Sequence, residues 1–129
     1  MVKQFEDLDI WKHSRELCKD IFRITNYEKM NKDFKFRNQI RASSGSVMDN
    51  IAEGFERNGN KEFIQFLFIA KGSCGEARSQ LYRALDSNYI DNEEFEIIYN
   101  KTFRLSRSIS SLIQYLKNSP ITGSKNLKP

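Results

Sequence analysis

The feature that most constrains the fold is an apolar pattern of helical period that fills almost the whole chain. In four segments, apolar residues recur at steps of three and four positions, the spacing that places side chains on one face of an α-helix. The pattern is strongest after Gly59, where it comprises Phe63, Phe66, Leu67, Ala70, Cys74, Ala77, Leu81, Ala84 and Leu85. No segment has the alternation of a β-strand. The sequence therefore predicts an all-α protein.

Polar residues, glycine and proline mark the ends of these helices. Short polar connections between long helices favour antiparallel neighbours, and 129 residues suffice for one domain with a single core. We predict an antiparallel up-down-up-down four-helix bundle over residues 1–118 and a flexible basic tail over 119–129. The expected helices run from about Asp7 to Thr25, from near Asp33 to the Asn58-Gly59-Asn60 turn, from Asn60 to about Asn88, and from Asp91 to Pro120.

Several of these end residues have an expected conformation or contact. Asp7 suits the N-cap of the first helix. Asp91, with Glu94 three residues later, has the pattern of a capping box at the start of the fourth. Gly59 suits the left-handed conformation that follows a helix end, and Asn60 suits the next N-cap.

The buried faces of the first two helices can also be predicted. The inward stripe of the second helix is expected to be Phe36, Ile40, Ser43, Val47, Ile51, Gly54 and Phe55. In the second helix, the small residues 42–46 indicate tight helix–helix packing, because Gly45 on its own weakens a helix by roughly 1 kcal/mol against alanine. The alternative is a ligand that approaches the helix there. In the first helix, the inward stripe is expected to be Trp11, Ser14, Cys18, Ile21, Phe22 and Thr25.

The third helix has more apolar surface than one core requires. Beside its core stripe it carries Ile64, Phe68 and Ile69 on other faces. A helix that is apolar nearly all round is buried on more than one side. We therefore expect self-assembly through these three residues. The alternative is that the N-terminal segment around Phe5 and Leu8 covers them.

The sequence contains no recognisable catalytic centre. His13 lies on the polar side of the first helix, and neither Cys18 nor Cys74 has a metal-ligand or catalytic spacing, so both are interpreted as buried thiols. Glu53 and Glu76 lean inward but lack the Glu-x-x-His partners of a di-metal bundle. We expect a non-enzymatic protein with no cofactor and no metal. Because it lacks an apolar leader and any run of about 18 apolar residues, we expect a cytoplasmic location and no membrane partner.

Charge gives a better functional signal. Lys and Arg outnumber Asp and Glu by 21 to 17, a formal net charge of +4, which permits an anionic partner. Three basic groups stand out: Lys29, Lys32, Lys35, Arg37 and Arg41; Lys101, Arg104 and Arg107; and Lys117, Lys125 and Lys128. A solvated face is the alternative interpretation. In a ring of identical subunits each group is repeated, which strengthens binding to a polyanion through phosphate contacts.

Five blocks of the sequence, in order, resemble a known family. They are Asp9-Ile10-Trp11-Lys12; Gln39-Ile40-Arg41-Ala42-Ser43; Asn50-Ile51-Ala52-Glu53-Gly54-Phe55; Phe66-Leu67 with Ile69-Ala70-Lys71-Gly72-Ser73 and Glu76; and Ala84-Leu85 with Tyr89-Ile90. Over roughly residues 5 to 116 the chain resembles the bacterial four-helix bundle proteins encoded in 23S ribosomal RNA intervening sequences.

This resemblance implies a bundle that assembles into a homopentamer. It also implies kinship with the accessory variability protein of diversity-generating retroelements, a basic pentameric ring that contacts reverse transcriptase and nucleic acid. It assigns no catalytic residue. Its signature positions are Asn50, Glu53, Gly54 and Arg57. Among them, Asn50 and Glu53 are expected to form a polar network that fixes helix register, and Gly54 is expected to allow close packing.

Two functions are compatible with these patterns. The leading hypothesis is a non-enzymatic, oligomeric protein that binds RNA or DNA through Lys32, Lys35, Arg37, Arg41, Lys101, Arg104 and Arg107. The alternative is a protein-interaction scaffold without nucleic-acid binding, in which the charged face serves solubility.

Overall fold

The computed structural model describes residues 1–119, and within that range every regular element is helical. A 3-10 turn, η1 (Phe5–Asp7), precedes the first long helix. The long helices are α1 (Asp9–Thr25), α3 (Phe34–Glu56), α4 (Asn60–Asp86) and α5 (Asn92–Asn118), with the short α2 (Glu28–Lys32) between the first two. The all-α prediction is confirmed. The predicted tail, with Lys125 and Lys128, lies outside the described residues apart from Ser119.

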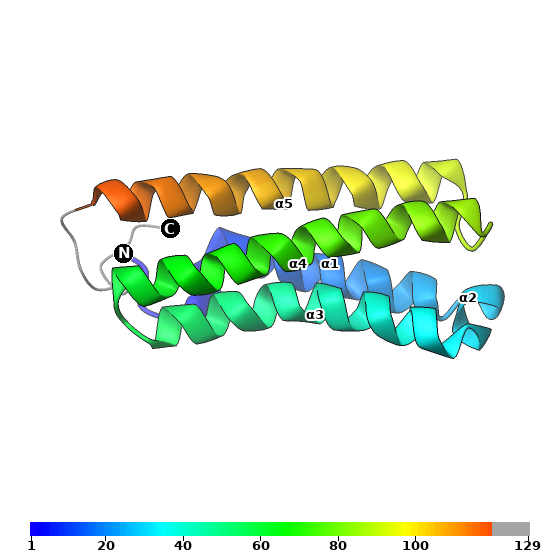
Figure 1. Cartoon of the computed structure of the whole chain (residues 1–129), viewed down its shortest axis with the longest axis horizontal. Helices are drawn as coiled ribbons and strands as arrows, with labels where there is room; N and C mark the ends of the chain where they lie inside the picture. Colours follow the sequence, from blue (N-terminus) through cyan, green and yellow to red (C-terminus); the bar gives the residue numbers. More distant parts are fainter. Residues whose placement is uncertain (120–129) are drawn as a thin grey trace.

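The four long helices run alternately in opposite directions and form one bundle (Figure 1). The helix α3 packs on α4, α4 packs on α5, and α1 packs on α3, which closes a ring in which α1 and α5 have the least extensive contact. This is the up-down-up-down arrangement that short connections favour. The α1–α5 seam is therefore the most open of the four.

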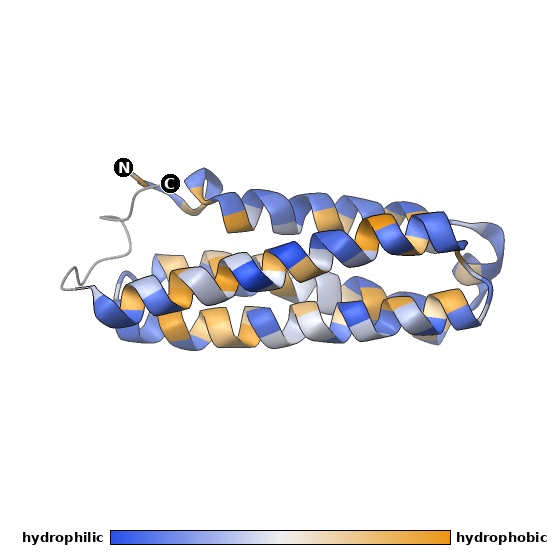
Figure 2. Ribbon diagram, turned by 90° about the horizontal axis from the view of Figure 1, so that it is seen from above, coloured by the Kyte–Doolittle hydropathy of each residue, from blue (hydrophilic) through white to orange (hydrophobic). Residues whose placement is uncertain are grey.

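The predicted faces of α3 and α4 form much of the core. Every residue of the predicted α3 stripe is buried: Phe36, Ile40, Ser43, Val47, Ile51, Gly54 and Phe55. On α4, Phe66 and Leu85 are only partly buried, and the other predicted core residues are buried. Hydrophobic and hydrophilic residues alternate along each helix, as helices with one wet face require (Figure 2). Removing these apolar faces from water is the main stabilising contribution.

The predicted face of α1 is rotated relative to the observed one. The buried residues are Ile10, Ser14, Leu17, Ile21, Ile24 and Thr25. Trp11 and Cys18 are half-buried, and Phe22 is 60% exposed. The sequence offers adjacent apolar residues, such as Ile21 and Phe22, and the contacts with α3 and α5 decide which one points inward. The prediction was wrong for Phe22, whose ring instead lies under the Arg41 guanidinium at 4.7 Å.

Three predictions about helix ends, those for Asp7, Gly59 and Asn60, are also wrong. The N-cap of α1 is Leu8, not Asp7, because the Asp7 carboxylate accepts hydrogen bonds from the backbone amides of Lys3 and Gln4. After α3, the left-handed residue is Asn58, at φ 59°. Gly59 is extended and is itself the N-cap of α4, and Asn60 is its first helical residue. Asparagine tolerates the left-handed region better than most residues, so the turn does not need the glycine there.

The cap of α5 follows the prediction more closely, and α3 begins next to Asp33 as expected. The Asp33 carboxylate accepts from the Phe36 amide at 3.3 Å, and the Asp91 carboxylate accepts from the Glu94 amide at 2.8 Å. The Glu94 side chain does not complete the capping box. It reaches instead to α1, so a residue that local sequence assigns to a cap is used for a tertiary contact.

The small residues of α3 divide into two kinds. Ser43 and Ser44 are buried. A Cβ added at Gly45 would have no atom within 4 Å, so tight packing does not explain this glycine, contrary to the prediction. Close approach occurs nine residues later on α3, where a Cβ on Gly54 would lie 2.5 Å from the Phe66 Cβ of α4. That expected role of Gly54 is confirmed.

Candidate functional site

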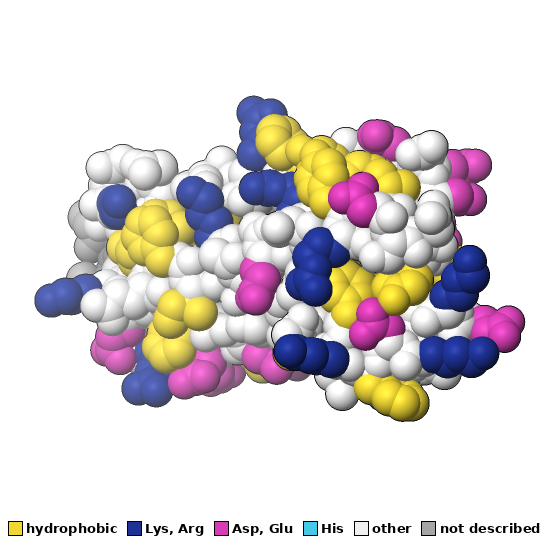
Figure 3. Space-filling model, turned by 45° about the vertical axis from the view of Figure 1, so that its right-hand side comes forward, with side chains coloured by type: hydrophobic (Ala, Val, Ile, Leu, Met, Phe, Trp, Pro, Cys, Tyr) yellow, Lys and Arg dark blue, Asp and Glu magenta, His cyan; other side chains and the backbone are white. Residues whose placement is uncertain are grey.

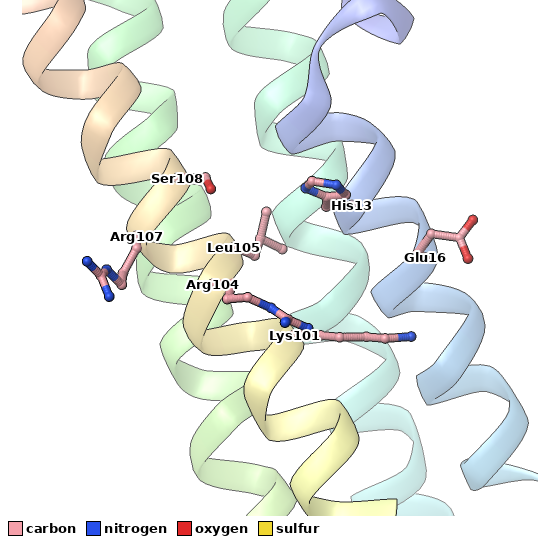
Figure 4. Close-up of a pocket in the computed structure, with 7 residues that line it drawn as sticks. All are labelled: His13, Glu16, Lys101, Arg104, Leu105, Arg107 and Ser108. Atoms are coloured by element: carbon pink, nitrogen blue, oxygen red, sulfur yellow. The ribbon is translucent and has the colours of Figure 1, made fainter.

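A groove lies along the open seam between α1 and α5. It has a volume of about 520 Å³ and is lined by His13, Glu16, Lys101, Arg104, Leu105, Arg107 and Ser108. Lys101 and Arg104 point from α5 toward α1, whereas Arg107 points away from it (Figure 4). Leu105 is buried and contributes an apolar floor. The groove therefore combines an apolar base with basic walls.

Two polar contacts close the seam at one end of the groove. Arg23 of α1 donates to Glu94 of α5, with 2.6 Å between Nη1 and Oε1, and the Tyr27 hydroxyl donates to the same carboxylate. The hydrogen bond from Arg23 lowers the pKa of Glu94. Nearer the groove, Lys101 contacts Asp20 at 2.8 Å. Within residues 1–119 no further ion pair joins α1 to α5.

The charges that line the groove are not balanced locally. Glu16 is paired with Lys19 on its own helix at 3.4 Å, and the Lys101 charge is offset by Asp20. Neither Arg104 nor Arg107 forms an ion pair with any residue of the described range 1–119. Two guanidinium groups therefore remain available for an anion. A guanidinium matches a phosphate group well, because it offers paired donors in one plane.

The structure brings part of the second predicted basic group together. Lys101 and Arg104 lie on one face of α5 because they are three residues apart, and Arg107 lies at the edge of the groove. The sequence missed His13 and Ser108 as members of this site. The spacing of Ser108 from Arg104 was the available signal for Ser108, whereas His13 joins the groove only through the packing of α1 beside α5.

The first predicted basic group is largely engaged in local contacts. Lys32 pairs with Glu28 at 3.4 Å. Arg37 donates to the backbone and side-chain oxygens of Asn31, at 3.1 and 2.9 Å. The Arg41 Nε donates to Thr25 Oγ1 at 2.8 Å.

These contacts fix α2 and α1 against the start of α3. Four residues of this first group were named for nucleic-acid binding. Within residues 1–119, only Lys35 among them is exposed and makes no ion pair or side-chain hydrogen bond. The α1–α5 groove is therefore the stronger candidate site. In the third group, Lys117 lies over the Phe68 ring at 5.2 Å.

The surplus apolar residues of α4 have different environments. Ile64 packs partly against the core. Phe68 and Ile69 are 47% and 52% exposed. The N-terminal turn η1 packs on α1 and α3, and Phe68 and Ile69 of α4 stay exposed. The alternative prediction, that the N-terminal segment covers Phe68 and Ile69, is therefore wrong.

The signature residues lie on α3 and its end. Asn50 donates to the Ser46 carbonyl and hydroxyl at 2.8 and 2.9 Å, and Ser46 contacts Ser73 of α4 at 2.8 Å. This is the expected polar link between helices. Glu53 is not part of it: the side chain is exposed and pairs with Arg57 at 3.1 Å. The prediction of a network that includes Glu53 was wrong.

The two thiols have no reactive environment. Burial raises the pKa of Cys74 to about 11 and also raises the pKa of Cys18, so both are protonated near neutral pH. Glu53 and Glu76 are exposed rather than inward-leaning. Among residues 1–119, no cluster of three His, Cys, Asp or Glu side chains is placed to hold a metal ion. In the same range no helix is long and apolar enough to cross a bilayer.

Fold and groove together define an all-α bundle protein with a basic interhelical groove. The model of one family, the 23S rRNA-intervening sequence proteins, matches residues 6–111, and the chain belongs to this family. A solved structure of similar fold is a protein of unknown function from the S23 ribosomal protein family of Bacteroides thetaiotaomicron. It is 25% identical, has a TM-score of 0.76, and aligns over 81% of this chain and 98% of its own. No curated protein gives a significant match.

Proposed function

We propose that this protein is a non-enzymatic, self-associating protein that binds nucleic acid along the α1–α5 groove. The observation that carries the proposal is the pair of arginines, Arg104 and Arg107, without a carboxylate partner in the described range. They line a groove next to Lys101 and His13. Phosphate contacts of this kind supply most of the affinity in sequence-independent binding.

Salt-dependent titration tests this proposal. A labelled RNA and a labelled DNA are titrated with the protein at several salt concentrations, and binding is expected to weaken steeply as salt rises. Arg104→Ala should weaken binding to every sequence and flatten the salt slope by about 1. Lys35→Ala, which removes the same charge from an exposed position outside the groove, is the matched control and should have little effect. If neither nucleic acid binds at low salt, the proposal is wrong.

Self-association is supported by the outer surface of α4. Phe68 and Ile69 are exposed, and a Cβ at the following Gly72 or Gly75 would meet no atom within 4 Å. Apolar side chains next to glycines without neighbours provide a surface that a second helix can approach closely. A closed ring would repeat the groove in each subunit. The resemblance to the accessory variability protein favours five subunits, which stays a prediction.

The assembly is tested by measuring mass. Light scattering after size exclusion should give several times the 15.2 kDa of one chain. Phe68→Glu should reduce the mass toward that of the monomer and leave the helical circular dichroism signal unchanged. Phe34→Glu changes a 64% exposed ring on α3 and serves as the control. A monomeric wild-type protein at micromolar concentration would contradict the proposal. If the protein does not bind nucleic acid but captures a protein partner, the scaffold alternative is favoured.

A further inference from the structure

A row of exposed aromatic rings crosses the outer surface of α4 and α5. Tyr82 of α4 and Phe103 of α5 are 48% and 43% exposed, and the half-buried Tyr99 lies between them. Ring centroids are 5.8 Å apart for Tyr82 and Tyr99, and 6.5 Å apart for Tyr99 and Phe103. The planes of the last two rings differ by only 16°. Scattered exposed aromatics are common, whereas a contiguous row of them indicates an interaction surface.

Arginines flank the end of this row. The guanidinium carbons of Arg78 on α4 and Arg107 on α5 lie 5.9 Å and 5.8 Å from the Phe103 ring centroid. Neither arginine forms an ion pair with a residue of the described range. Yellow and dark blue side chains accordingly lie side by side on the face of the molecule that carries α4 and α5 (Figure 3). Flat rings beside uncompensated guanidinium groups match a ligand that has both π-faces and negative charge.

Arg107 connects this row to the groove on the other side of α5. It belongs to the lining of the α1–α5 groove and also approaches Phe103. A strand whose phosphates contact Arg104 and Arg107 can therefore place its bases over Phe103 and Tyr99. Phe68, the residue changed in the self-association test, lies fourteen residues before Tyr82 on α4, about 21 Å along the helix axis, with Gly72 and Gly75 between them.

We propose that Tyr82, Tyr99 and Phe103, with Arg78 and Arg107, form a stacking platform for unpaired bases, so that the partner is single-stranded RNA or DNA. This inference rests on the proposed function and specifies the kind of nucleic acid. Bases in a duplex stack on one another and cannot reach a side-chain ring, whereas unpaired bases stack on aromatic side chains and on arginine planes. Every base has a π-face, so the platform favours single strands with little dependence on sequence.

The test compares strands of equal length. Fluorescence anisotropy is measured for a labelled oligouridylate, the corresponding oligothymidylate, and a duplex of the same number of nucleotides per strand. Wild-type protein is expected to bind both single strands more tightly than the duplex. Phe103→Leu and Tyr82→Leu, which keep an apolar side chain without the ring, should each reduce single-strand affinity by roughly tenfold and leave duplex affinity unchanged. Tighter binding of the uridylate than of an oligodeoxyuridylate, which has the same base and lacks the 2′-hydroxyl, would identify RNA as the preferred source.

Phe34→Leu is the matched control, because Phe34 is an exposed ring with a guanidinium, that of Arg37, 4.9 Å from its centroid. It lies on α3, away from the platform, and should bind like wild type. Equal affinity for single strand and duplex, or unaltered single-strand binding in both platform variants, would overturn this inference and leave groove binding intact. A change in assembly mass in the leucine variants would overturn it in favour of a subunit interface. Absence of all binding would overturn the proposed function and this inference together.

Discussion

Gly54 of α3 lies so close to Phe66 of α4 that a Cβ built on the glycine would be 2.5 Å from the Phe66 Cβ. The Phe63 ring is also near, at 3.0 Å from the same position. Distances below 3.0 Å are not compatible with normal contacts, and the Phe66 Cβ cannot move without its helix. The tight contact between α3 and α4 therefore depends on the missing side chain.

Gly54→Ala is expected to destabilise the protein despite the better helix propensity of alanine. The added methyl group forces α3 and α4 apart, which should lower the free energy of unfolding by about 1–3 kcal/mol. Gly45→Ala is the control, since nothing lies within 4 Å of its Cβ, and it should stabilise the protein by up to about 1 kcal/mol. Urea denaturation measures both. Equal effects of the two substitutions would show that packing at Gly54 is not tight.

The contact between Arg23 and Glu94 predicts a pH-dependent contribution to stability. The pKa of Glu94 is below its ordinary value of 4.5 because Arg23 and Tyr27 donate to the carboxylate. The contribution is therefore complete above pH 4.5 and is lost as the pH falls through the lower, folded-state pKa. Glu94→Gln should cost about 0.5–1 kcal/mol at neutral pH, a small value because the Arg23 side chain is 47% exposed and solvent screens the pair.

The control for this pair is Glu93→Gln. Glu93 lies in the same first turn of α5, so its removal costs the same favourable interaction with the helix dipole. The two variants and the wild type are unfolded in urea across the acidic range. The excess cost of Glu94→Gln should disappear in strongly acidic buffer. An excess that persists there would contradict the assigned role of the ionised carboxylate.

The thiols provide a kinetic prediction. With its pKa at about 11 rather than 9.0, Cys74 has about a hundredfold less thiolate than a free cysteine at pH 8. Burial slows it further. In a Cys18→Ser variant, reaction of Cys74 with a disulfide reagent should be slow and should follow the unfolding rate, as shown by acceleration in urea. Rapid labelling of the folded protein would indicate an opening of the bundle near Thr102, whose carbonyl the thiol contacts at 3.3 Å.

The hydroxyl contact between Ser46 and Ser73 predicts a coupling energy. The two side chains join α3 to α4 at 2.8 Å. A double-mutant cycle with Ser46→Ala and Ser73→Ala removes differences in helix propensity and should give a coupling of about 0.5–1.5 kcal/mol. Asn50 also donates to Ser46, so the cycle is repeated in an Asn50→Ala background. A coupling energy of zero in both backgrounds would mean that the hydrogen bond between the two hydroxyls is no more stable than their hydrogen bonds to water.

Much of the site follows from α5 alone. Helical spacing is enough to place Lys101 and Arg104 on one face, and the capping residues Asp33 and Asp91 act within four residues of sequence. Local rules of this kind hold because the interacting groups are fixed by the helix itself. The prediction for Asp7 was wrong because its carboxylate accepts from the backbone amides of Lys3 and Gln4, which leaves Leu8 at the N-cap of α1. The prediction for Gly59 was wrong because asparagine also tolerates the left-handed region, which Asn58 occupies.

The sequence by itself determined the four long helices, their antiparallel order and the all-α class, since apolar period and end residues are local properties. It did not predict the short α2 in the first connection. Packing decided what each surface does. It turned Phe22 outward and left Gly45 without neighbours. It also carried Glu94 to Arg23 and brought His13 of α1 to the groove that Arg104 of α5 lines. These outcomes depend on which helices pack together and on how each helix is rotated about its axis. Contacts between residues far apart in sequence determine both, and they exist only in the folded bundle.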